Sequence, residues 1–323
     1  MKSGAEDFYK NQRGEKRMRK IRIAIFLVAF LSVNSFAHIT LLKNYDQQQE
    51  VFKTEKVAGN VYVLYGRGGN IGVSYGADGM MIIDTQFAEV ADKVKAELAK
   101  LGTDKPKFIF NTHWHGDHSG GNEIFGKDSI ILAHTNVRKR MLETTLFMGE
   151  KRTPSPKAAL PVLTYDEGVS LHFNGEEIRA VYFPNGHTDG DTVLFFTSSN
   201  AVHLGDDFFI GRFPFVDLES KGSVEGLLRN IGDLLQMIPA DAKIIPGHGQ
   251  VGTIDNLRDY HQMLLETAII VRKAMKEGKS LDEIKKAGFP EKFKEAGSGF
   301  IKSDNWIETI YKSYSTSLLQ VKQ

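Results

Sequence analysis

The sequence predicts an α/β protein, classed as α+β in some schemes, built as a four-layer αββα sandwich with its helices outside. Two observations support this architecture. In each half of the chain, short β-rich runs are followed by segments in which apolar residues have helical spacing. The 323 residues, of which 41% are hydrophobic, are also enough to bury the core of one large domain.

The first half begins with three β-rich runs at residues 60–65, 71–75 and 80–84. Glycine-containing turns separate these runs, which predicts an antiparallel meander. Apolar residues at helical spacing then predict a helix over residues 87–101. This half is completed by strands at 108–110 and 130–133 and by a helix over 136–148.

The second half follows the same plan without a detectable sequence repeat. Strands are predicted at residues 177–183, 192–196, 201–204 and 243–245. Helices are predicted over residues 224–237, where Pro239 ends the helix, and over 256–277. Two more helical stretches finish the chain.

The N-terminus has the three parts of a secretory signal peptide. A basic stretch at 16–22 precedes an apolar run at 23–33, which is too short to span a bilayer comfortably. Small residues follow at Ser35 and Ala37, the two positions that a signal peptidase reads. We therefore expect residues 1–37 to be a signal peptide.

This signal peptide sets the expected organisation of the rest of the chain. Met18 is an alternative start, because the residues before it lengthen the basic region unusually. The polar stretch 38–51 is expected to be a linker, which leaves 52–323 as the folded domain with its C-terminal helices. The mature protein would be periplasmic or secreted, with no stable membrane span, whereas an uncleaved apolar run would form a single membrane anchor.

Charge and cysteine content narrow the range of partners. A net charge of +1 argues against nucleic acid, because phosphate binding normally needs a basic surface. The sequence has no cysteine, so it forms no disulfide and offers no thiolate as a nucleophile or metal ligand. Nothing in the composition predicts an oligomeric state.

The densest group of ligand-capable side chains is the run Thr-His-Trp-His-Gly-Asp-His. In an extended backbone, His113 and His115 point to the same side. Gly116 then permits a sharp turn that brings Asp117 and His118 toward a neighbouring point. Two neighbouring clusters of nitrogen and oxygen ligands are what two adjacent metal ions require.

Three further candidate ligands each follow a glycine near an apolar run: His187, Asp206 and His248. Strand ends joined by glycine loops hold a site rigidly at one edge of a sheet. The complete set contains only imidazole and carboxylate groups, so two Zn²⁺ ions per chain fit best, and iron or manganese would also suit it. Such a site stays cationic, which favours a small-molecule substrate with an anionic group.

The order His-x-His-x-Asp-His, Gly-His, Gly-Asp and Pro-Gly-His resembles the metallo-β-lactamase superfamily, from about residue 60 to about residue 248. The resemblance implies that 52–323 is a hydrolase domain with the fold of that family. It also implies a first metal bound by His113, His115 and His187, a second bound by Asp117, His118 and His248, and Asp206 bridging both.

Some β-lactamases of this fold use a cysteine as a ligand of the second metal, and this chain has none. Asp206 instead resembles the bridging aspartate of glyoxalase II-like and lactonase-like members. A β-lactam is therefore not the expected native substrate.

The expected activity is zinc-dependent hydrolysis in which a metal-bridging hydroxide attacks an ester, thioester, lactone or amide bond. Asp117 is the predicted catalytic residue, because it would orient that hydroxide or carry its proton. The alternatives are hydrolysis of β-lactams, oxidation by a mononuclear iron as in persulfide dioxygenases of this fold, and binding without catalysis. The complete ligand set argues against the last two.

Two residues outside the ligand set also have expected roles. Asp84 resembles the family's aspartate that orients metal-bound histidine rings, and a turn or helix cap is its alternative role. His134 is expected to be structural.

Substrate choice is expected to depend on the segments 66–70, 149–161 and 207–215. The last of these carries four phenylalanines and Arg212, which would form an apolar wall with one cation for an anionic tail. A run of this kind is more often packed core, which is the alternative.

Overall fold

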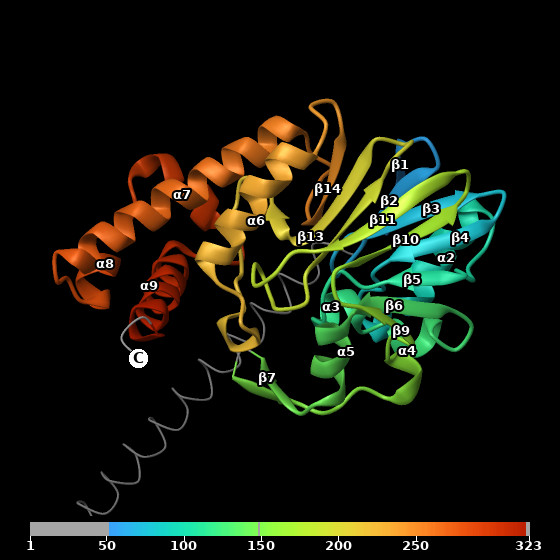
Figure 1. Ribbon diagram of the computed structural model, residues 1–323, viewed down its shortest axis with the longest axis horizontal. Coiled ribbons are helices and arrows are strands. Elements are labelled where there is room, and N and C mark those ends of the chain that lie inside the picture. The colour runs from blue at the N-terminus through green and yellow to red at the C-terminus, as the bar shows by residue number, and fades with distance from the viewer. Residues whose placement is uncertain (1–51, 148, 321–323) are drawn as a thin grey trace, which may run out of the picture. The chain divides into compact units, whose positions relative to one another are not determined.

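The computed structural model describes residues 52–147 and 149–320. The predicted signal peptide 1–37, with the alternative start Met18, and the linker 38–51 lie outside these residues and remain predictions. Within the described part, two mixed sheets pack face to face and helices cover their outer faces (Figure 1).

The first sheet has seven strands in the order β1-β2-β3-β4-β5-β6-β9. The first four form the predicted antiparallel meander, and the other three run parallel to one another after longer connections. Their bounds are β1 (Lys53–Ala58), β2 (Val61–Tyr65), β3 (Ile71–Gly76), β4 (Gly79–Ile83), β5 (Phe108–Phe110), β6 (Ile130–His134) and β9 (Leu163–Tyr165).

The second sheet has five strands in the order β10-β11-β12-β13-β14. All neighbours are antiparallel except β13 and β14, which are parallel because helix α6 connects them. Their bounds are β10 (Gly168–Phe173), β11 (Glu176–Tyr182), β12 (Thr192–Phe196), β13 (Ala201–Phe209) and β14 (Lys243–His248). The edge strands β1 and β10 are not predicted from the sequence. Charged and polar residues dominate β1, and β10 alternates apolar residues with glycine, serine and histidine.

The central core lies between the two sheets. Val63 and Phe110 of the first sheet belong to one buried cluster with Ile178 and Leu194 of the second. On the outer face of the first sheet, α2 (Ala91–Leu101) buries the apolar stripe that predicted it. These layers place the ends of β5, β11 and β14 around one edge of the sandwich.

Helices α6 (Val224–Met237), α7 (Ile254–Lys276) and α9 (Ser303–Gln320) cover the outer face of the second sheet (Figure 1). The predicted four-layer αββα arrangement is therefore confirmed. Across residues 52–147 and 149–320, none of the helices combines the length and the apolar character needed to cross a bilayer. The short helices are α3 (Gly116–Ser119), α4 (Asn122–Phe125), α5 (Thr135–Leu142), α8 (Leu281–Ala287), η1 (Ala88–Val90), η2 (Lys157–Ala159), η3 (Leu218–Ser220), η4 (Glu291–Phe293) and η5 (Ala296–Ser298).

The predicted helix over 136–148 is wrong in its second half. Helix α5 ends at Leu142, and Glu143 already has an extended backbone. The β-branched Thr144 and Thr145 follow, and such residues lose side-chain freedom in a helix. The chain instead forms a two-stranded hairpin of β7 (Thr145–Phe147) and β8 (Glu150–Arg152).

Trp306 on α9 should be the most costly side chain to truncate in the helical layer. It is fully buried, its Nε1 donates a hydrogen bond to Thr267 Oγ1 on α7 at 3.0 Å, and its ring stacks on Phe213. We expect Trp306→Ala to lower the free energy of unfolding by about 3–5 kcal/mol, measured by urea denaturation. A loss below about 1 kcal/mol would show that this contact does not hold the layer together.

Candidate metal centre

The seven predicted ligands come from both sheets and meet at one edge of the sandwich. The first sheet contributes four of them, in the loop after β5 and on the short helix α3. From the second sheet, His187 lies in the loop between β11 and β12, Asp206 lies in β13, and His248 is the last residue of β14. The extended segment before α3 places two histidine rings side by side, as the alternation of side chains predicts.

Asp206 does not lie at a strand end, so that expectation is wrong. The predicted strand 201–204 continues to Phe209, and its pairing with β14 changes register around Gly205. Gly205 has a φ of 53°, which glycine adopts at little cost. The resulting irregularity in β13 turns the carboxylate of Asp206 toward the other ligands.

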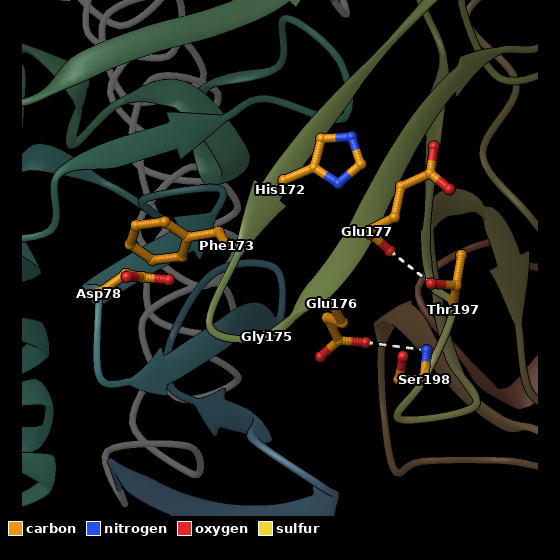
Figure 2. A pocket seen from close by; sticks show the side chains of 8 residues that line it. All are labelled: Asp78, His172, Phe173, Gly175, Glu176, Glu177, Thr197 and Ser198. Carbon is orange, nitrogen blue, oxygen red and sulfur yellow. Dashed lines mark hydrogen bonds between the residues drawn. The ribbon is translucent and has the colours of Figure 1, made fainter.

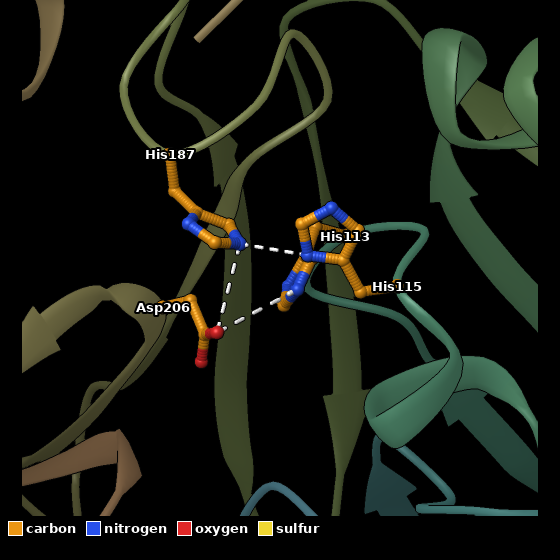
Figure 3. Close-up of side chains that lie close together, drawn as sticks. All are labelled: His113, His115, His187 and Asp206. Atoms are coloured by element: carbon orange, nitrogen blue, oxygen red, sulfur yellow. Dashed lines mark hydrogen bonds and ion pairs between the residues drawn. The ribbon is translucent and has the colours of Figure 1, made fainter. Parts of the chain in front are cut away.

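The ligand atoms form two groups. In each group one donor atom per residue lies within 4.8 Å of every other. The first group consists of His113, His115, His187 and Asp206, which Figure 3 shows pointing toward one another, and the second consists of Asp117, His118 and His248. Both groups contain only the residues that the sequence predicts.

Asp206 joins the two groups because its two oxygens face different ones. Oδ2 lies 3.6 Å from His187 Nε2 and 3.9 Å from His113 Nε2. Oδ1 lies 3.1 Å from His118 Nε2 and 3.6 Å from His248 Nε2. Ligands at about 2.1 Å from a tetrahedral ion lie about 3.4 Å from one another, so these separations suit two ions that share one carboxylate.

Hydrogen bonds behind the first group hold its rings with the site-facing nitrogen unprotonated. His187 Nδ1 donates to the carbonyl oxygen of Phe215 at 2.8 Å, which leaves Nε2 toward the site. His115 Nε2 pairs with Asp217 Oδ2 at 2.9 Å, which leaves Nδ1 toward the site. The second nitrogen of a metal-bound histidine usually has such a partner.

Asp84 likewise orients the rings of His118 and His113, the first directly and the second through Thr112. Its Oδ2 lies 2.7 Å from His118 Nδ1 and accepts a hydrogen bond from Thr112 Oγ1, also at 2.7 Å. Because the Thr112 proton is used in that bond, His113 Nδ1 donates to Thr112 Oγ1 at 3.0 Å. Asp84 is fully buried and has a φ of 67°, so its predicted position behind the histidine rings is confirmed.

The donor atoms of the first group are arranged to bind a metal cation between them. His115 Nδ1 and His187 Nε2 lie 2.9 Å apart, and both present lone pairs. His113 Nε2 is also buried, and it has no hydrogen-bond partner within the described part of the chain. Bringing unsatisfied acceptors together in a buried site is costly unless a cation lies among them.

Electrostatics differ between the two groups. Burial lowers the pKa of His113 well below its usual value and lowers that of His187 to about 4. Burial also acts to lower the pKa of His118 and His248, but nearby carboxylates, above all Asp206, outweigh it, and the pKa of His248 rises to about 9. The rings of His113 and His187 are therefore neutral and can bind a cation, whereas His118 and His248 carry protons when no cation is bound.

The second group is also the open one. The side chains of Asp117 and His248 are 26% and 37% exposed, whereas every member of the first group is buried. Burial acts to raise the pKa of Asp117, but His118 and His248 lower it below its usual value, so its carboxylate stays ionised. Substrate and water therefore reach the site from the side of the second group.

Asp217 is a functional residue that the sequence does not reveal. It lies 102 positions from its partner His115 and also caps η3 through hydrogen bonds from Glu219 N and Ser220 N. Aspartate is one of the residues most often found at a helix N-cap, so nothing local distinguishes Asp217 from an ordinary cap.

We expect Asp217→Asn to weaken the first ion selectively. The amide still caps η3, but it no longer accepts a charge-assisted hydrogen bond from His115, which lowers the basicity of that ligand. Zinc affinity at the first group should fall by about 10- to 100-fold, measured by chelator competition. Unchanged affinity would mean that the 2.9 Å contact does not tune His115.

The aromatic segment 207–215 divides between core and site. Phe208 and Phe213 are buried in the core, as the alternative predicts. Phe209 stacks on His248 at 5.8 Å, and Phe215 lies 5.8 Å from the ring of His115. Arg212, predicted as a cation for the substrate, is exposed, and its side chain lies near Gly299.

The predicted substrate segments 66–70 and 149–161 both reach the ligand loop. In the first, the amide of Gly69 donates to the carbonyl oxygen of Asp117 at 3.0 Å. In the second, Arg152 lies over the ring of Trp114, and a Cβ added at Gly116 would be 2.6 Å from its guanidinium.

His134, by contrast, stacks on Tyr182, and its Nδ1 accepts a hydrogen bond from Asn136 N, so its predicted structural role is confirmed.

A separate hollow of about 470 Å³ lies at the turn between β10 and β11 (Figure 2). Its acidic side chains already have partners: Glu176 accepts hydrogen bonds from Ser198 N and Ser199 Oγ, and Glu177 from Ser170 Oγ. It is therefore not a second candidate site.

Comparison with known proteins agrees with this geometry. The model of the metallo-beta-lactamase superfamily matches residues 57–269, which is more than half of the chain. The chain belongs to the metallo-beta-lactamase superfamily. A hydroxyacylglutathione hydrolase of Synechococcus sp. is 29% identical over 180 residues, which cover 54% of this chain and 63% of that protein. A probable metallo-hydrolase of Methanocaldococcus jannaschii is 29% identical over 186 residues, covering 53% and 84% respectively.

Solved structures of other proteins share the fold. A stereoselective inverting sec-alkylsulfatase from Pseudomonas sp. has a TM-score of 0.62 at 15% identity, covering 82% of this chain and 50% of the other. A metallo-beta-lactamase from Pontibacter korlensis has a TM-score of 0.56 at 16% identity, covering 67% and 99%. At such identities the likeness establishes the fold alone.

Proposed function

We propose that this chain is a dinuclear, zinc-dependent hydrolase that cleaves an ester, thioester, lactone or amide bond of a small molecule. The observation that carries this proposal is Asp206, whose two oxygens face two separate sets of nitrogen ligands. The relative from Synechococcus sp. supports hydrolysis of an acyl bond, because it is named as a hydroxyacylglutathione hydrolase. The chain spans 63% of that relative, so its substrate does not transfer directly.

Two divalent ions, when bound, lower the pKa of water toward about 7 and polarise the oxygen of the bond to be cleaved. The chain's own residues then orient the reactants. Asp117 is ionised, partly exposed and 3.2 Å from His248, so its carboxylate can accept a hydrogen bond from the attacking water and hold its proton. The three histidine rings of the first group are held by hydrogen bonds to a backbone carbonyl oxygen, a carboxylate and a threonine hydroxyl, which preserves this geometry during turnover.

The rim of the site supports a substrate with an apolar part and an anionic part. The ring of Phe209 lies against that of His248, and the ring of Phe215 lies against that of His115. Arg152 provides a cation next to Gly116, between the ligands of the two groups. An acyl group against the phenylalanines and a carboxylate near the guanidinium would use both features.

Two other activities remain as candidates for the same site. Hydrolysis of β-lactams would use the same ions, and the absence of a cysteine ligand in the sequence argues against it. A mononuclear iron oxygenase would need the first group alone, and the intact second group argues against that function. Binding without catalysis would not require Asp117 to be ionised and accessible.

The test is hydrolysis by zinc-loaded protein of a panel that contains a hydroxyacyl thioester, an aryl ester, a lactone, a phosphodiester and a cephalosporin. We expect turnover of acyl substrates that is lost after chelation and restored by zinc. Fully loaded protein that hydrolyses none of them, or that hydrolyses only the phosphodiester, would contradict the proposal.

A further inference from the structure

We propose that residues 68–70, between β2 and β3, position the second metal group, and that Asn70 is the positioning residue through which they act on His248. The inference rests on the proposed dinuclear site. These residues contact Asp117, His118 and the loop of His248, which together make up the second group. No residue of this segment is itself a ligand.

Asn70 fixes the backbone on both sides of His248. Its amide N donates a hydrogen bond to the carbonyl oxygen of Gly247 at 2.6 Å. Its side-chain Nδ2 donates to the carbonyl oxygens of Pro246 at 2.9 Å and Gly249 at 2.8 Å. Asn70 is 4% exposed, so water does not replace these bonds easily. The loop that presents His248 is therefore held by one side chain of the opposite sheet.

A chain of hydrogen bonds through the buried His203 also connects Asn70 to the residue before Asp206. His203 Nε2 donates to the carbonyl oxygen of Asn70 at 3.1 Å, and His203 Nδ1 accepts a hydrogen bond from Gly205 N at 3.1 Å. Burial lowers the pKa of His203 to about 4, so it stays neutral and keeps both bonds. Gly205 is the irregular position that turns Asp206 toward the site. The sequence assigns no function to His203, and this network provides one.

Gly69 brings the same segment against the remaining two ligands. Its amide donates to the carbonyl oxygen of Asp117 at 3.0 Å, and its own carbonyl oxygen accepts from Gln86 Nε2 at 2.8 Å. A Cβ at Gly69 would overlap the imidazole of His118, so only glycine allows the backbone to pack on that ring. The backbone of residues 68–70 thus packs directly against ligands of the second group.

The affinity for the second ion can therefore change while the affinity for the first stays the same. Asn70→Ala removes the side-chain bonds on both sides of His248, but it keeps the main-chain carbonyl oxygen that His203 bonds and so leaves Asp206 in place. The first group has its own partners, Asp217 behind His115 and the carbonyl oxygen of Phe215 behind His187, and neither is bonded to residues 68–70. Loss of a partner that positions a ligand typically costs about 10- to 100-fold in metal affinity. Asn70→Ala should therefore lower the affinity for the second ion by about that factor and change the affinity for the first by less than about twofold.

The experiment is chelator competition with zinc alone, which resolves the two dissociation constants without any substrate. Asn70→Ser serves as a second variant, since it keeps the backbone bond to Gly247 and is more easily accommodated. Asn174→Ala is the matched control: it is 7% exposed and joins the two sheets through hydrogen bonds to Ser74 Oγ and the carbonyl oxygen of Gly79. Asn174 has a φ of 54°, so its replacement by alanine should cost at least as much stability.

We expect both Asn70 variants to lower only the affinity for the second zinc ion. Asn174→Ala should lower the melting temperature and leave both zinc affinities unchanged. Equal weakening of both ions in the Asn70 variants, or the same selective loss in Asn174→Ala, would overturn the inference. If the unmodified protein binds only one zinc ion, the dinuclear proposal itself fails, and this outcome is distinct from the failure of Asn70 to position His248.

Discussion

Replacing Asp206 with asparagine is expected to abolish tight metal binding at both groups. Hydrolysis should fall by more than about 100-fold, which exceeds the loss expected when only a residue that positions a ligand is removed. The reason is that each oxygen of Asp206 faces a different group. An amide has one weaker acceptor and directs N–H donors at the histidines or at the ion. Metal analysis after dialysis against zinc, together with turnover of the best acyl substrate, measures both effects.

Asp207→Asn is the matched control for this prediction. Asp207 is the next residue in β13 and is also buried, but it accepts a hydrogen bond from His187 N and belongs to neither metal group. Its pKa is raised by burial to about 7, so a neutral amide is a mild change there. Two zinc ions and near-normal turnover in Asp206→Asn would show that the carboxylate does not join the groups.

The second large effect is expected from Asp117→Asn. The variant keeps the size of the side chain and one oxygen, but it removes the charge that binds metal and accepts a proton. Hydrolysis should fall by about 10²-fold or more, the usual scale for a positioned proton-transfer group. The first group should keep its ion because its four members do not include Asp117, whereas occupancy of the second should fall.

The fold should survive this substitution, because Asp117 is partly exposed and belongs to none of the apolar clusters. Kinetics, metal content and urea denaturation of the same preparation distinguish loss of chemistry from loss of structure. Near-normal turnover with both sites occupied would contradict the catalytic role given to Asp117.

The ligands could be predicted from the sequence because their chemistry is local. Imidazole and carboxylate groups recur beside glycines that follow apolar runs, and the run from His113 to His118 places four ligands on one loop. The partners of these ligands could not be predicted. Asp217 pairs with His115 across 102 positions, and Asn70 bonds Gly249 across 179 positions, so only the folded chain brings them together.

The same distinction applies to the fold. The strands with apolar runs and the long helices were predictable because their patterns repeat over several residues. The helix predicted over 136–148 failed because Thr144 and Thr145 favour extended backbone and because β7, which begins at Thr145, pairs with β8, a contact outside the local pattern. The irregular step at Gly205 was also hidden, since a glycine before an aspartate equally predicts the end of a strand.

The number of zinc ions per chain tests the central claim most directly. Protein saturated with zinc, dialysed and measured by elemental analysis should contain two ions per chain, because the seven ligands form two groups that share Asp206. A single tightly bound ion in the unmodified chain, with no second ion at any zinc concentration below the onset of non-specific binding, would contradict the dinuclear account.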